Sequence, residues 1–172
     1  TMKNDIAFAK EQGANGIVFG ILTSNGTIDT QRTQALIEAA RPLNPTFHRA
    51  FDLTRDPFEA LETLIDLGID RILTSGGTPS VDQGIETIQK LVEQSQNRIP
   101  IMPGGGIHEK NVASMIQKTN AKEIHFSGRI QTESPMQFRN ETMAFSSPTQ
   151  SEYTHHITDA NRIRAILNAT KE

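Results

Sequence analysis

The sequence predicts an α/β fold built around parallel strands. Apolar runs of strand length alternate five times with segments in which apolar residues recur at helical spacing. Strands in this order pair in parallel, because each helix crosses over the sheet before the next strand begins. A chain of 172 residues with 35% hydrophobic and 22% charged residues is long enough to bury a core, and it fits a single domain over residues 1–172.

The first half of the chain contributes two of the strands. Residues 16–22 form a continuous apolar run, which is typical of a strand covered on both faces. A predicted helix over residues 30–40 separates this run from a second strand that begins at Thr46. Asp56 and Pro57 mark the start of the next helix, because Asp caps free amides and Pro is tolerated at the first helical position.

The second half contributes three further strands, the first beginning at Arg71 and the others spanning residues 99–102 and 123–128. Two predicted helices lie between these strands. Residues 129–158 have no clear period and are rich in Ser, Thr and Gln, so we expect a long irregular segment there. The periodic segment over residues 159–169 predicts a C-terminal helix.

Two architectures use this order of elements. An open doubly wound sheet needs no further strands, whereas a (β/α)8 barrel needs eight strands and about 250 residues. The strand count therefore favours the open sheet. The strand ends favour the barrel, because polar residues follow strand after strand, and barrel sites are built at that face. These residues are His48 with Asp52, Thr74 with Ser75, Gly104 to Gly106, and His125 with Ser127.

The segment that runs from Thr46 to Asp52 places unusual side chains next to a buried strand. If it is extended, His48 and Asp52 share one face, and Arg49 lies on the other. We therefore expect His48 and Asp52 to point into whatever the sheet encloses, and Arg49 to point toward the helices. An imidazole suits proton transfer, a guanidinium binds anions and a carboxylate holds either group in place, so all three are candidate site residues.

The glycine triplet Gly104-Gly105-Gly106 lies between a strand and a helix, where exposed amides can bind a phosphate or carboxylate. The same triplet also fits a tight turn that needs positive φ. His125 and Ser127 share one face of their predicted strand, so both are expected to point inward. We take His48 and His125 as candidate catalytic residues, and the remaining polar residues at the strand ends as candidate ligand-binding residues.

Composition narrows the possible partners. The net charge is −3, and its 17 basic residues are spread along the chain without the basic cluster that nucleic-acid binding requires. No apolar stretch approaches the roughly 18 residues needed to cross a bilayer. Cysteine is absent, which suits a cytoplasmic protein and leaves five methionines as the sulfur donors. Their spacing is not clustered, so the residues themselves predict no metal site.

Several long segments resemble the CutC family, which is named for copper homeostasis. The segments that carry the resemblance are GIVFGILTSNG, PTFHRAFDLTRDPFEALETLIDLGIDRILTSGG, IMPGGGIHEKN, EIHFSG and SPMQFRN. The resemblance implies a TIM-like (β/α)8 barrel of which this chain covers about five of the eight βα units. Five strands leave open sheet edges, so we expect self-association into a homo-oligomer.

The resemblance and the residues lead to two hypotheses for function. The family implies a protein of copper homeostasis or tolerance, with copper ion as a candidate ligand. The residue chemistry instead favours a barrel enzyme that acts on a small anionic or phosphorylated metabolite. The two hypotheses differ in whether the chain is an enzyme, and the residues fit both.

Overall fold

The computed structural model describes residues 1–140, 142 and 151–171. At its centre lies a four-stranded parallel sheet whose spatial order equals the chain order. Its strands are β1 (Gly16–Phe19), β2 (Asn44–Phe47), β3 (Arg71–Thr74) and β4 (Ile101–Pro103). A helix between each strand and the next allows neighbouring strands to pair in parallel.

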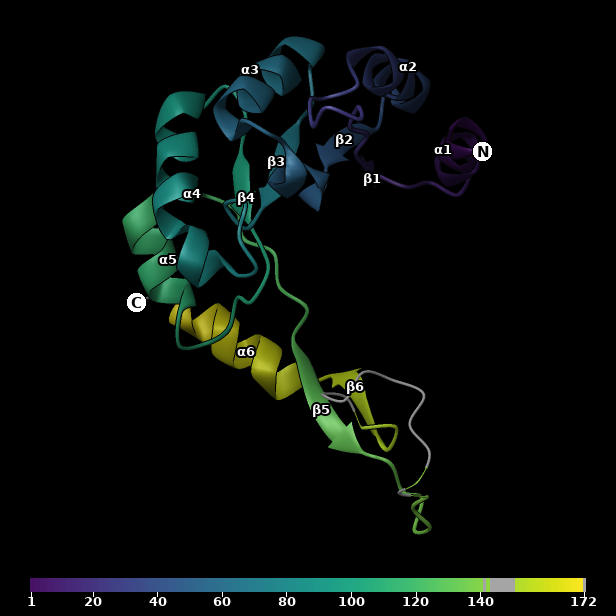
Figure 1. Cartoon of the computed structure of the whole chain (residues 1–172), viewed down its shortest axis with the longest axis vertical. Coiled ribbons are helices and arrows are strands. Elements are labelled where there is room, and N and C mark those ends of the chain that lie inside the picture. The colour runs from purple at the N-terminus through teal and green to yellow at the C-terminus, as the bar shows by residue number, and fades with distance from the viewer. Residues whose placement is uncertain (141, 143–150, 172) are drawn as a thin grey trace.

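Helices cover one side of this sheet (Figure 1). Helix α1 precedes the sheet, and α2 to α5 form the outer layer along it. The helices are α1 (Met2–Glu11), α2 (Thr30–Ala40), α3 (Pro57–Leu67), α4 (Val81–Ser95) and α5 (Val112–Thr119). The predicted start of α3 is confirmed, because the Asp56 side chain accepts hydrogen bonds from the amides of Phe58 and Glu59. None of the helices in the described residues is long and apolar enough to cross a membrane.

The core lies between the sheet and the outer helices. Phe19, Phe47, Ile72 and Ile101 occupy neighbouring positions on the four strands, and each is at most 4% exposed. Burying an apolar side chain of this size stabilises a fold by about 1.5–3 kcal/mol. This row therefore fixes the register of the sheet, since a one-residue slip of any strand would turn its member away from the helices.

The opposite face of the sheet is more open to solvent. Val18 in the middle of β1 is 63% exposed, and Leu73 and Met102 are half-buried. The prediction that residues 16–22 form a strand covered on both faces is therefore wrong. The apolar run supplied one row of side chains to the helices, and among the described residues no element covers the other row at Val18.

Beyond β4 the structure departs from the sequence prediction in two places. The strand expected over residues 123–128 is reduced to a single parallel bridge between Gly104 and His125, because the glycine triplet turns away after Gly104. The segment expected to be irregular contains β5 (Arg129–Glu133) and β6 (Thr154–Thr158), which pair as an antiparallel ribbon that extends away from the sheet (Figure 1). Helix α6 (Ala160–Ala169) follows the ribbon.

Candidate functional site

The chain turns sharply where β2 ends, and this turn places Arg49 beside Asp52. A 3-10 helix, η1 (Arg49–Leu53), begins two residues after Phe47. Residues three apart eclipse one another in a 3-10 helix, so Arg49 and Asp52 lie on the same side, with Nε 2.7 Å from Oδ2. The predicted inward pair of His48 and Asp52, and the outward Arg49, are therefore wrong, because strand alternation stops where the strand stops.

Asp52 anchors the turn that follows β3. Its carboxylate accepts hydrogen bonds from the Thr74 hydroxyl, from the Ser75 amide at 3.0 and 3.1 Å, and from the Gly77 amide at 3.0 Å. Burial raises the pKa of Asp52, but these bonds and the Arg49 guanidinium lower it by more, so the pKa lies below its ordinary value. Asp52 is thus an ionised group whose acceptor positions are already used by the protein.

Arg49 is fixed on one side and open on the other. Its Nη2 donates to the Ser75 hydroxyl at 2.5 Å and to the Thr78 carbonyl oxygen at 3.2 Å, in addition to the Nε bond with Asp52. Its Nη1 faces the glycine triplet, since a Cβ added to Gly105 would lie 3.0 Å from that atom. Among the described residues no hydrogen-bond acceptor is recorded for Nη1.

The glycine triplet is held in place through its carbonyl groups. The Val81 amide donates to the Gly105 oxygen at 2.9 Å, and the Asn111 side chain donates to the Gly106 oxygen at 2.9 Å. Asn111 is itself buried and fixed by Asp82. Both glycines have positive φ, of 111° and 85°, so the tight-turn interpretation of the triplet is correct for its backbone. The amides of Gly105 and Gly106 have no recorded partner within the described part of the chain.

A cavity of about 360 Å³ lies beside this turn. It is lined by two arginines, two histidines, a serine and the turn itself, namely Arg49, Arg162, His108, His125, Ser127, Gly105 and Gly106. Two guanidinium groups give it a positive charge, and the Asp52 carboxylate that offsets part of this charge is directed toward the backbone of the β3 to α4 turn. The arrangement suits a small anion with several acceptor oxygens.

The structure brings some of the predicted site residues together and leaves one apart. Arg49, Gly105, Gly106, His125 and Ser127 line the cavity. Asp52 and Ser75 bond to Arg49 and hold it, and Thr74 donates to Asp52. Buried Gly104 pairs with His125.

His48 is the predicted residue that lies apart. It begins η1, where its Nδ1 accepts from the Ala50 amide at 3.1 Å, and it sits beside Gly20. A neutral His48 ring therefore carries its proton on Nε2. His48 does not line the cavity, so the structure does not place it with His125 as an acid and base pair.

The sequence analysis missed His108 and Arg162. His108 follows the glycine triplet by two residues, and that position was the available signal. Arg162 comes from α6, and no local pattern could have placed it here. Its Nη1 donates to the Arg129 carbonyl oxygen at 3.0 Å, and its Nε lies 3.8 Å from Glu109 Oε2.

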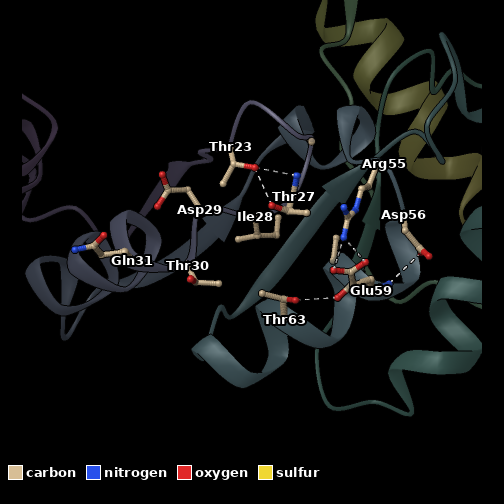
Figure 2. Close-up of a pocket in the computed structure, with 12 residues that line it drawn as sticks. Thr23, Thr27, Ile28, Asp29, Thr30, Gln31, Arg55, Asp56, Glu59 and Thr63 are labelled. Carbon is tan, nitrogen blue, oxygen red and sulfur yellow. Dashed lines mark hydrogen bonds and ion pairs between the residues drawn. The ribbon is translucent and has the colours of Figure 1, made fainter.

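A second, larger cavity of about 540 Å³ lies between the loop after β1 and the first turns of α2 and α3. Figure 2 shows that its polar side chains are largely engaged with one another. Thr23 and Thr27 share a hydrogen bond of 2.8 Å, Arg55 pairs with Glu59 at 3.2 Å, and Asp56 caps α3. We take the smaller of these two cavities as the candidate functional site, because Arg49 Nη1 has no hydrogen-bond acceptor among the described residues.

The histidines and carboxylates of the chain do not form a metal cluster where the structure describes them. In the described ranges, no group of three or more His, Cys, Asp or Glu side chains is arranged to hold a metal ion. His108 and His125 both line the smaller cavity, and an imidazole is a ligand for copper and zinc.

Comparison with known proteins identifies the family. The family model described as CutC family matches residues 1–130. The chain belongs to the CutC family. The resemblance seen in the sequence segments is therefore confirmed. In a mouse relative named copper homeostasis protein cutC homolog, 44% of residues are identical over 99% of this chain and 63% of that protein. A human relative of the same name is 45% identical over 96% of this chain and 61% of that protein. The chain thus spans less than two thirds of the length of these relatives.

Solved structures agree on the fold. The crystal structure of the putative copper homeostasis protein CutC from Streptococcus agalactiae superposes with a TM-score of 0.69 at 38% identity, over 72% of this chain and 60% of that one. A KDPGal structure superposes with a TM-score of 0.58 at 15% identity, over 98% of this chain and 64% of that one, which supports the fold alone. The TIM-like fold class predicted from the strand ends and the family resemblance is confirmed, and the open doubly wound sheet is set aside.

Proposed function

We propose that this chain serves copper homeostasis and that its own contribution is to bind a small anion at the C-terminal ends of the strands. The first part rests on the names of its mouse and human relatives. The second part rests on one observation, which is the Arg49 guanidinium held by Asp52, Ser75 and Thr78 with its Nη1 directed toward the glycine triplet. A guanidinium fixed in this way loses little side-chain freedom when an anion binds.

The charge around the cavity supports an anionic ligand. Arg49 and Arg162 line it together with Gly105 and Gly106, whose amides form no hydrogen bond within the described residues. Asp52 does not compete for Arg49 Nη1, because its two oxygens are occupied by Nε and by donors of the β3 to α4 turn. Charge-assisted hydrogen bonds of this kind are roughly twice as strong as neutral ones.

Copper ion stays a predicted ligand of the whole protein. Cu(I) prefers thiolate and thioether ligands, and the chain contains no cysteine. Met115 is fully buried in the core, Met102 lies half-buried in β4, and Met143 lies outside the described residues. If copper contacts this cavity, His108 and His125 are the side chains that would meet it.

Catalysis on the bound anion is a second candidate function. The His125 main chain is fixed by a 2.8 Å hydrogen bond from its amide to the Pro103 carbonyl oxygen, while its side chain is exposed at the cavity. An imidazole in this position suits proton transfer to or from a bound metabolite. We propose His125 for this role, and an asparagine in its place should abolish turnover while leaving anion binding intact.

Ligand-dependent thermal stability separates the anion from copper. The full chain is heated alone, with Cu(I), with Zn(II) as a metal control, and with phosphate, sulfate and citrate at constant ionic strength. We expect anions to raise the midpoint temperature of thermal unfolding of the parent chain. The midpoint temperature of Arg49→Gln should be the same with and without anions. Arg55→Gln is the matched control, because Arg55 is an exposed arginine that does not line this cavity. An anion response that survives in Arg49→Gln would contradict the proposal, and a copper shift larger than the zinc shift would favour direct copper binding.

Location and assembly are proposed from the same observations. Composition favours the cytoplasm, and fractionation of a tagged full-length protein tests this. Strand β1 is an edge of the parallel sheet, with Val18 exposed, so a second copy would bury apolar surface there. A chain that sediments as a monomer at micromolar concentration would contradict the homo-oligomer.

A further inference from the structure

We infer that the anion is the phosphate group of a small phosphate monoester, bound between Arg49, the amides of Gly105 and Gly106, and Arg162 of α6. This inference rests on the proposed anion site and adds the chemical class of its ligand. It also gives α6 a part in binding, which neither the family match over residues 1–130 nor the sequence pattern assigns.

The number and placement of the donors favour phosphate over carboxylate. Arginine has five N–H donors, and Arg49 uses three of them on Asp52, Ser75 and Thr78, which leaves the two on Nη1. Gly105, Gly106 and Arg162 line the same cavity, the two glycine amides form no hydrogen bond within the described residues, and Arg162 uses only Nη1 for a hydrogen bond, to the Arg129 carbonyl oxygen. A carboxylate has two coplanar oxygens, whereas the three terminal oxygens of a phosphate ester point in three directions and can meet all three groups.

The charge also matches a phosphate ester. A phosphate monoester carries about −1.5 to −2 charges at pH 7, whereas a carboxylate carries one. Arg49 and Arg162 both line the cavity; Arg49 Nε lies 2.7 Å from Asp52 Oδ2, whereas Arg162 Nε lies 3.8 Å from Glu109 Oε2. Because Arg162 is only loosely paired with Glu109, its guanidinium is available to a ligand, and a doubly charged group gains more from it than a singly charged one.

The size of the cavity limits the rest of the ligand. At about 360 Å³ it lies near the lower end of the roughly 300–1,000 Å³ range of small-molecule sites, which excludes a dinucleotide or another large cofactor. The remaining lining is apolar and consists of Leu73, Ile107 and Phe126. A phosphate with a short carbon chain fits this division, because the charged end meets the donors and the carbons meet the apolar side.

Arg162 links ligand binding to the position of α6. The helix is attached to the rest of the chain through Ile166, which is fully buried, and through Ile163, which packs so closely on Gly128 that a Cβ there would lie 2.6 Å away. A phosphate that contacts both Arg49 and Arg162 connects η1 to α6. Binding should therefore slow amide hydrogen exchange in residues 160–169. If Arg49 alone binds the ligand, the exchange rates of these residues should not change.

Binding of matched probes tests the inference. Dissociation constants are measured by calorimetry for glycerol 3-phosphate and for glycerate, which has a carboxylate in place of the phosphate-bearing carbon. We expect glycerol 3-phosphate to bind at least about tenfold more tightly than glycerate, and Arg162→Gln to weaken it by about tenfold or more. Arg162→Lys should recover part of this loss, since it restores the charge without the planar fork.

Arg164→Gln is the matched control, because Arg164 lies on the same helix, bonds to Asn161 and does not line the cavity. Equal or tighter binding of glycerate would overturn the phosphate inference and leave the proposed anion site standing. The inference would also be overturned if Arg162→Gln bound glycerol 3-phosphate as tightly as the parent and showed the same slowing of amide hydrogen exchange in α6. Failure of both probes to bind the parent would instead contradict the proposed function itself.

Discussion

Replacing Asp52 with alanine should lower the free energy of unfolding by about 3 kcal/mol at pH 7. The change removes the acceptor for the Thr74 hydroxyl and the Ser75 amide, and both residues are fully buried. Each buried donor left without a partner costs about 1–3 kcal/mol. Gly77 and Arg49 also lose their acceptor, but water can reach both residues, so they add little.

Urea unfolding measures this loss, and thermal unfolding provides an independent check. For a chain of this size 1 kcal/mol shifts the midpoint by about 2–4 °C, so about 6–12 °C is expected. Asp66→Ala is the control, because Asp66 is an exposed aspartate on α3 and should change stability by no more than about 0.5 kcal/mol. If Asp52→Ala loses no more stability than Asp66→Ala, the network around Asp52 does not hold the turn.

The same variant has a defined pH dependence. The pKa of Asp52 is lower in the folded chain than its ordinary value of 3.8, so the folded state favours the ionised carboxylate. Its contribution is therefore complete above about pH 3.8 and is lost as the pH falls through the lower, folded pKa. The stability difference between the parent and Asp52→Ala should stay constant from pH 7 to about pH 5 and then shrink in more acidic solution.

Two further predictions concern the ion pair between Glu62 and Arg98 and the close approach of α4 to the turn after β3. Hydrogen bonds from Arg98 and Gln94 lower the pKa of Glu62 from 4.5 to about 2. The stability that ionised Glu62 contributes is therefore present above pH 4.5 and lost as the pH falls through about 2. When the free energy of unfolding is measured against pH, Glu62→Gln should lack the loss of stability that the parent shows in this acidic range. Gly84→Ala should destabilise the chain by about 3 kcal/mol or more and abolish anion binding, because the new Cβ would lie 1.9 Å from the Ser75 carbonyl oxygen. A variant that unfolds at the same urea concentration as the parent would refute this.

Elements that depend on local signals could be predicted from the sequence. Helix α3 begins at its Asp56 cap and ends at Gly68, whose φ of 77° suits glycine, and both signals lie within the segment itself. The ribbon of β5 and β6 could not be predicted in this way. Each strand carries a single Ile, Ile130 or Ile157, and these pair only across the intervening segment. A strand with one apolar residue has no alternation to detect.

The site shows the same division between local and tertiary information. Polar residues at strand ends led to Arg49, His125 and Ser127, because the ends of parallel strands meet at one edge of the sheet whatever the details of packing. The contribution of Arg162 depends on how α6 docks, which is a tertiary contact between distant segments. The sequence could not show that His48 lies away from the cavity, since its position beside Arg49 says nothing about which side of the turn it occupies.

The contacts that fix Arg49 do not involve α6, and this makes the two proposals separable. Asp52, Ser75 and Thr78 all belong to η1 or to the turn between β3 and α4, and none of them depends on α6. A variant that loses Arg162 should therefore keep Arg49 in place and keep a weaker anion site. A variant that loses Arg49 should keep α6 docked through Ile166, yet lose binding altogether. The two proposals together describe a site with a preformed guanidinium at the sheet and a second cation on α6, and in that proposed site the second cation would determine which anions are bound tightly.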